Sequence, residues 1–105
     1  MTAGAGAHAF LQRTEPRAGS TVRTPPSQVK VWFTESLEPA FSNVQVVDES
    51  GRRVDNGDSR VDPSNLTLLR TSLPSLPPGT YKVLWRVLSV DSHVTEGDFT
   101  FRVAP

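Results

Sequence analysis

The sequence contains no cysteine, so disulfide bonds, zinc sites built from thiolates and cysteine nucleophiles are all excluded. It also has no excess charge, because 11 Lys and Arg residues balance 11 Asp and Glu residues. A neutral total argues against a nucleic-acid backbone or an anionic membrane surface as the partner. No apolar run approaches the ~20 residues that a membrane-spanning helix needs. The length of 105 residues predicts one domain with a single core.

Methionine and histidine are scarce: Met1 is the one methionine, and His8 and His93 are the two histidines. The opening MTAGAGAHAF lacks the basic and apolar regions of a full signal peptide, yet residues 5–7 have the small-x-small form that signal peptidase prefers before its cut. Cleavage there would make His8 the first residue. The alternative is a flexible leader or expression remnant, and the triplet alone does not decide. We therefore expect residues 1–7 to be a disordered leader or remnant, and residues 8–105 to be the domain.

Apolar residues recur at every second position, which is the signature of β-strands. The longest such run is 80–89, and others cover 8–14, 28–33, 43–47, 66–68 and 99–103, with Pro- and Gly-rich turns between them. This pattern predicts an all-β fold, a seven-stranded antiparallel Greek-key β-sandwich or barrel that is immunoglobulin-like. Large aromatic residues dominate such interiors, so we expect the core to include Phe33, Phe99, Phe101, Trp32 and Trp85.

Catalytic motifs are weak in this chain. No G-x-S-x-G elbow is present, so serine hydrolysis is not favoured. Acidic pairs such as Glu35 and Glu38 fall in turn-like stretches and are most simply explained as solvated side chains. A glycosidase would need a cleft that the sequence does not reveal.

Asp91 and His93 are the residues that point most directly to chemistry. In an extended chain, side chains two residues apart lie on the same side, so one carboxylate oxygen and one imidazole nitrogen could meet a single metal ion. A turn aspartate followed by an exposed histidine is the alternative, and the pair alone leaves both open. An amino-terminal His8 would add its α-amine and ring nitrogen. The resulting set of three nitrogens and one oxygen suits tetragonal Cu(II), while Zn(II) lies below Cu(II) in the affinity order.

Three stretches of the chain carry a resemblance to a known family: HAFLQRTEPRAGSTV, VWFTESLEP and LPPGTYKVLWRVLSVDSHVTEGDFTFRV. They contain an opening histidine, a Phe-x-Glu-x-Leu stretch, a Pro-Gly-x-Tyr strand entry, a Trp-Arg-Val strand, and Asp-x-His followed by a Phe-x-Phe strand. On these features the chain closely resembles the copper-resistance CopC family across residues 8–103.

The resemblance implies a periplasmic or other extracytoplasmic β-sandwich that binds Cu(II) through His8, Asp91, His93 and the α-amine of His8. It also implies that Glu35 lies near that site. From it we expect a monomeric protein, without catalysis of its own, that sequesters copper or delivers it to a CopD-like membrane copper transporter, fused or separate. Two rivals stay open: a copper-dependent oxidative enzyme with an amino-terminal histidine chelate, and a plain immunoglobulin-like interaction module.

Three departures from the family pattern matter. The family's Cu(I) site uses a methionine-rich loop, whereas Met1 is the one methionine here, so Cu(I) binding by thioethers is not supported. Many relatives have glycine and proline around the second histidine, where this chain has Ser92 and Val94. With residues 1–7 attached, the nitrogen of His8 is an amide and cannot bind metal.

Overall fold

Eight short strands and one turn of 3₁₀-helix make up the regular structure of residues 10–105, which are the residues that our computed structural model describes. Seven strands were predicted and eight are observed in these residues; the two shortest, of two and three residues, are too short to show alternation in sequence. The elements are β1 (Leu11–Glu15), β2 (Thr21–Val22), β3 (Gln28–Phe33), η1 (Pro39–Phe41), β4 (Asn43–Val47), β5 (Arg60–Asp62), β6 (Asn65–Ser72), β7 (Gly79–Leu88) and β8 (Val94–Val103).

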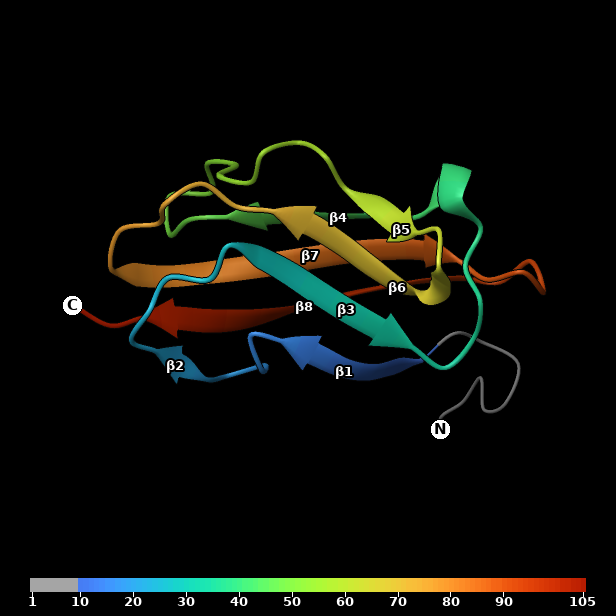
Figure 1. Cartoon of the computed structure of the whole chain (residues 1–105), viewed down its shortest axis with the longest axis horizontal. Coiled ribbons are helices and arrows are strands. Elements are labelled where there is room, and N and C mark those ends of the chain that lie inside the picture. The colour runs from blue at the N-terminus through green and yellow to red at the C-terminus, as the bar shows by residue number, and fades with distance from the viewer. Residues whose placement is uncertain (1–9) are drawn as a thin grey trace.

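The strands form two four-stranded sheets that pack face to face, which confirms the predicted β-sandwich (Figure 1). One sheet has the order β1-β3-β6-β5 and the other has the order β2-β8-β7-β4. All strand pairs within these sheets are antiparallel except β2 with β8, which run parallel. The prediction of a wholly antiparallel fold is therefore wrong at this edge, where the two residues of β2 pair with Arg102 and Val103.

The core lies between the sheets and consists of the apolar residues that alternate along the strands. In β3 the side chains at 29, 31 and 33 are buried, while those at 28, 30 and 32 are only partly covered. Burial of alternate apolar side chains from both sheets removes their surface from water, and this supplies most of the driving force for folding. The largest fully buried side chains include Phe33, Phe101, Leu37, Leu69, Val83 and Val87.

The two tryptophans behave differently from each other. Trp32 was expected in the core, but it follows Val31 and precedes Phe33, so its side chain lies on the outer face of its sheet. There the guanidinium of Arg13 lies 3.9 Å from the centre of a Trp32 ring, a cation–π contact. Trp85 is partly buried and packs against the core, with its ring 5.1 Å from that of Phe33 in an edge-to-face arrangement.

Two predicted strand boundaries need adjustment, and both bear on the metal-binding prediction. β7 covers Gly79–Leu88 where 80–89 was expected, so Ser89 belongs to the turn. β1 begins at Leu11, and the first residues of the predicted strand, including His8, lie outside the described residues. The start of β1, the end of β3 and the β7–β8 turn all lie at the same end of the molecule, on the right in Figure 1.

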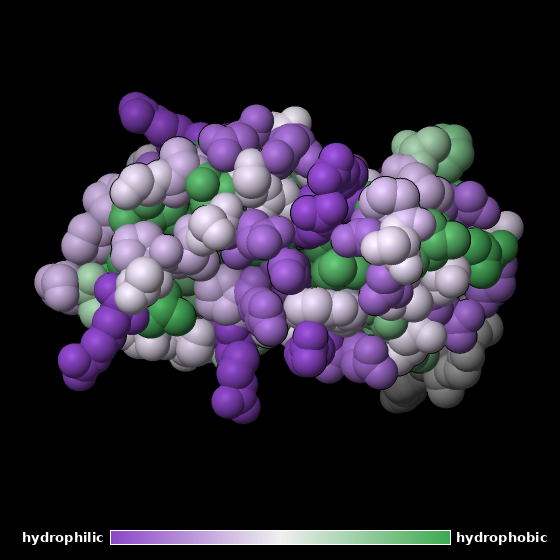
Figure 2. Space-filling model, viewed as in Figure 1, coloured by the Kyte–Doolittle hydropathy of each residue, from purple (hydrophilic) through white to green (hydrophobic). Residues whose placement is uncertain are grey.

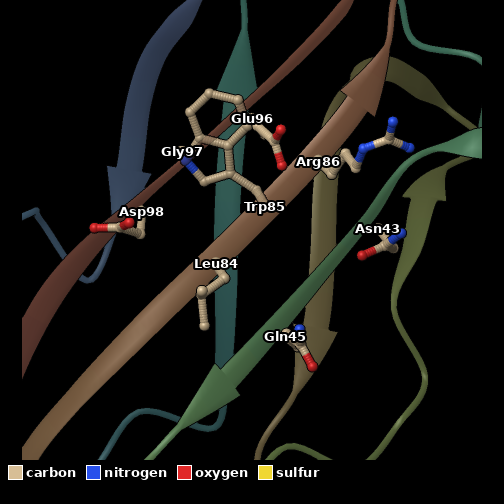
Figure 3. Close-up of a pocket in the computed structure, with 8 residues that line it drawn as sticks. All are labelled: Asn43, Gln45, Leu84, Trp85, Arg86, Glu96, Gly97 and Asp98. Atoms are coloured by element: carbon tan, nitrogen blue, oxygen red, sulfur yellow. The ribbon is translucent and has the colours of Figure 1, made fainter.

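Gly97 of β8 gives Trp85 the space for its ring. The two residues pair across β7 and β8, and a Cβ atom at position 97 would lie 2.6 Å from Cζ2 of Trp85 (Figure 3). That separation is far below van der Waals contact. Because the same ring also packs on Phe33, it cannot withdraw without disturbing the core.

We predict that Gly97→Ala destabilises the fold by ~1–3 kcal/mol, the usual cost of forcing an extra methyl group into a packed site. Urea denaturation of the wild type and the variant measures this difference. Trp85→Phe is the matched control: the smaller ring relieves the overlap, so Gly97→Ala should cost clearly less in that background. Equal stability of wild type and Gly97→Ala would contradict the packing described.

Candidate metal centre

The β7–β8 connection is a tight turn of five residues, 89–93, closed by backbone hydrogen bonds. The amide of Ser89 donates to the carbonyl of His93 at 3.0 Å, and the amide of Ser92 donates to the carbonyl of Ser89 at 2.9 Å. Ser92 has φ +73°, in the left-handed region. An L-residue other than glycine adopts this conformation at a cost of ~1–2 kcal/mol.

Asp91 and His93 meet inside this turn, as the sequence predicted, although the reason is different. An extended strand was expected to place them on one side, whereas a chain reversal at Ser92 brings them together. Nδ1 of His93 lies 3.2 Å from Oδ1 of Asp91, and the side chains are 44% and 37% exposed. The two side chains are therefore partly open to solvent, although Nδ1 of His93 itself is buried against its surroundings.

Ser89 holds the carboxylate of Asp91 in place. Its hydroxyl donates to Oδ1 of Asp91 and lies 3.2 Å from the carbonyl oxygen of His93. Ser89 itself is fully buried, so packing fixes the position of its hydroxyl. The hydrogen bond from Ser89 is the largest cause of a lowered pKa of Asp91, with His93 adding to the effect and desolvation opposing it. The carboxylate is thus kept ionised, as a metal ligand must be.

The Asp91–His93 separation fits two neighbouring ligand atoms of one ion. Atoms bound ~2.0–2.1 Å from a metal, at an angle of about 90–110°, lie ~2.8–3.4 Å apart. The observed 3.2 Å falls in that interval. The pair supplies one nitrogen and one oxygen, and a metal ion would need further donors to complete its coordination.

One segment, residues 34–38, joins this turn to the start of β1. Phe10 and Thr34 exchange hydrogen bonds, with the amide of Phe10 on Oγ1 of Thr34 and the amide of Thr34 on the carbonyl of Phe10. The amide of Val90 donates to the carbonyl of Ser36 at 3.0 Å, and the amide of Glu38 donates to the carbonyl of Leu88 at 2.8 Å. The first described residue and the Asp91–His93 turn are therefore attached to the same short stretch of chain.

The other two predicted site residues, Glu35 and His8, do not form a metal-binding cluster with the Asp91–His93 pair in the residues that the structure describes. Glu35 is half-buried and lies in the segment between Thr34 and Ser36, beside the turn. Within residues 10–105, no group of three or more His, Cys, Asp or Glu side chains could hold a metal ion, so Glu35 does not join Asp91 and His93 in such a cluster. His8 lies outside the described residues. Ser89 was missed by the sequence analysis, although its place two residues before Asp91 continues the spacing that joins Asp91 to His93.

A separate hollow of about 490 Å³ lies on the sheet formed by β4, β7 and β8. Figure 3 shows Arg86, Glu96 and Asp98 around it, together with Trp85 and Gly97. Its lining contains no histidine, and it lies along the β7–β8 ladder away from the turn. The chemistry of the candidate site therefore does not depend on this hollow.

We predict that Ser89→Ala raises the pKa of Asp91 toward its ordinary value of 3.8, because the largest cause of the lowering is removed. A carboxyl ¹³C NMR titration measures it. Since the folded-state pKa is depressed, Asp91 stabilises the fold above its ordinary pKa, and this contribution is lost as the pH falls through the depressed value. Ser92→Ala removes a hydroxyl from the same turn and should leave the pKa unchanged. An unaltered pKa in Ser89→Ala would exclude the assigned role.

Comparison with known proteins gives consistent matches over the whole sandwich. The model of the CopC domain family matches residues 11–104. Copper resistance protein C of Pseudomonas syringae pv. tomato is 32% identical over 111 residues, covering 98% of this chain and 86% of that protein. The crystal structure of CopC from Methylosinus trichosporium OB3b superposes with a TM-score of 0.87 at 36% identity, covering 93% of this chain and 95% of the other.

A further relative shows a similar region within a much longer protein. The copper transport protein CutJ of Bacillus subtilis (strain 168) is 29% identical over 98 residues. The match covers 92% of this chain and 18% of the length of CutJ. Among the described residues of this chain, none forms a helix long and apolar enough to cross a membrane.

Proposed function

The chain belongs to the CopC family, and from this premise we propose that it binds one Cu(II) ion through His8, Asp91 and His93. It then sequesters the ion outside the cytoplasm or delivers it to a membrane copper transporter, without catalysis of its own. The observation that carries the proposal is the 3.2 Å separation between Nδ1 of His93 and Oδ1 of Asp91 in a turn tied to the start of β1.

The attachment of the chain around residue 34 supports a shared site for His8 and His93. Thr34 and Ser36, which hold Phe10 and Val90, are two residues apart, so their backbones are separated by at most ~7 Å. His8 precedes Phe10 by two residues, so the backbones of these two residues are also separated by at most ~7 Å. An imidazole and an α-amine at position 8 can therefore meet the Asp91–His93 pair without rearrangement of the sandwich.

The donor set favours Cu(II). Two imidazoles, an amine and a carboxylate provide three nitrogens and one oxygen, a set that suits the tetragonal geometry of Cu(II). The same ligands bind Cu(II) more tightly than Zn(II). Soft sulfur donors, which Cu(I) prefers, are absent from residues 8–105. Glu35 is proposed to lie beside the site and to orient or neutralise it without binding the metal.

The names of the relatives support the proposed destination of the ion. One relative is called a copper resistance protein, and another is called a copper transport protein whose matching region is 18% of its length. Storage or delivery fits these names. It also fits a site that consists of a tight surface turn, because a substrate of an oxidative enzyme would need a cleft beside the metal.

We predict that a chain beginning at His8 binds one Cu(II) and that the chain beginning at Met1 binds it at least ~100-fold more weakly. In the longer chain the nitrogen of residue 8 is an amide, so the chelate with the imidazole is lost. Competitive titration against a Cu(II) chelator of known affinity measures both chains. Equal affinities would show that the α-amine is not a ligand.

We predict that His93→Ala and Asp91→Asn each lower the Cu(II) affinity of the chain beginning at His8, with at least ~100-fold lost for His93→Ala. Asp98→Asn removes an exposed carboxylate from β8 outside the turn and is the matched control. Its affinity should equal that of the wild type. If His93→Ala binds Cu(II) as tightly as Asp98→Asn does, the proposed site is wrong.

A further inference from the structure

The large apolar side chains that remain exposed are gathered at one end of the molecule. Within residues 10–105, six are exposed, and the most exposed are Phe41 at 66% and Val90 at 52%. In Figure 2, apolar surface reaches the solvent at the end where η1 and the β7–β8 turn lie. We call this surface the apolar end, and it consists of Phe10, Leu11, Phe41, Leu66, Val90 and Val94.

Backbone contacts hold these six residues around one segment, 33–41. Leu11 pairs with Phe33, and Phe10 bonds with Thr34. The carbonyl of Leu66 accepts from the amide of Leu37, and the amide of Phe41 donates to the carbonyl of Glu38.

The β7–β8 turn is attached to the same segment. The amide of Val90 donates to the carbonyl of Ser36. Val94 pairs with Leu88, whose carbonyl accepts from the amide of Glu38. The apolar end is therefore one contiguous region of the fold, with fixed backbone positions.

The chain segments that carry the apolar end have charged residues of one sign. These segments, residues 10–12, 34–42, 62–67 and 88–95, carry Glu35, Glu38, Asp62 and Asp91. They contain no lysine or arginine, so all 11 basic residues of the chain lie in other segments. Asp62 is paired with Arg70 and is largely covered, so the acidic rim around the exposed apolar side chains consists of Glu35, Glu38 and Asp91.

We propose that the apolar end is a docking surface for a protein partner whose matching face is apolar and edged with lysine or arginine. Apolar anchors inside a charged rim are the usual anatomy of a specific interface, and opposite charges at the rim speed encounter and select the partner. An anionic membrane would be repelled by the carboxylates of Glu35, Glu38 and Asp91. A second copy in a two-fold arrangement would bring the same acids together.

Docking at this end would cover the Asp91–His93 turn, since Val90 and Val94 flank it. A partner bound here would meet any ion held in the turn, so the surface is suited to direct transfer. The docking itself does not rest on the proposed function. Copper titration and partner binding are separate measurements, and each can fail alone.

The test begins with photocrosslinking in cells of the source organism. A photoreactive amino acid replaces Phe41 or Leu66, neither of which is a proposed ligand, and Arg52, in the exposed 48–53 loop, is the control position. Both apolar-end positions should crosslink to one and the same protein, at a segment that contains lysine or arginine, and position 52 should not. Crosslinks to lipid alone, to a second copy of the chain, or to no protein would overturn the proposal.

The crosslinked protein is then purified, and its binding to defined variants is measured by titration calorimetry. Phe41→Ser and Glu38→Lys should each weaken binding at least ~10-fold, as expected for an interface anchor and a complementary charge. Glu49→Lys, which reverses an exposed acid outside the four segments of the apolar end, should bind like the wild type. Added salt should weaken binding of the wild type more than of Glu38→Lys. Equal binding by Glu38→Lys and Glu49→Lys would overturn the proposal.

Discussion

The hydrogen bonds made by residues 34–38 are the constraint on which this end of the molecule depends. Thr34 holds Phe10 on one side, and Ser36 holds Val90 on the other. The first strand belongs to one sheet and the β7–β8 turn to the other, so without this segment the two would have no reason to lie together. The segment extends β3 beyond the sheet, and it thereby links the two layers of the sandwich at the place where the metal is proposed to bind.

The turn itself combines a stable anchor with a local cost. Ser89 is fully buried and directs its hydroxyl at Asp91, while Ser92 accepts a left-handed backbone that glycine would adopt without a penalty. A buried hydroxyl that lacks a hydrogen-bond partner destabilises a protein, so the hydroxyl of Ser89 favours the conformation in which it donates to Asp91. The result is a carboxylate and an imidazole held at a ligand-like separation before any ion arrives, which lowers the conformational cost of binding.

The sequence alone predicted the sandwich and most of its core, because alternation of apolar residues reports directly on which side of a strand faces inward. It was wrong for Trp32, where the preference of large aromatics for the interior was given more weight than the alternation with Val31 and Phe33. The parallel β2–β8 pair could not be predicted, since two residues carry no period. Asp91 and His93 were brought together as expected, but through a turn whose φ angle at Ser92 no spacing rule shows. Ser89 was passed over because serine has no metal-binding signature.

One end of this small β-sandwich carries two features: a preformed Asp91–His93 pair, and exposed apolar side chains inside an acidic rim. The proposed metal centre requires that the two histidines of the chain share one ion. Pulsed EPR of the chain that begins at His8, loaded with one Cu(II), counts the imidazoles on the metal. We predict two imidazoles on a single type of centre. One imidazole, or two separate centres with one imidazole each, would contradict it.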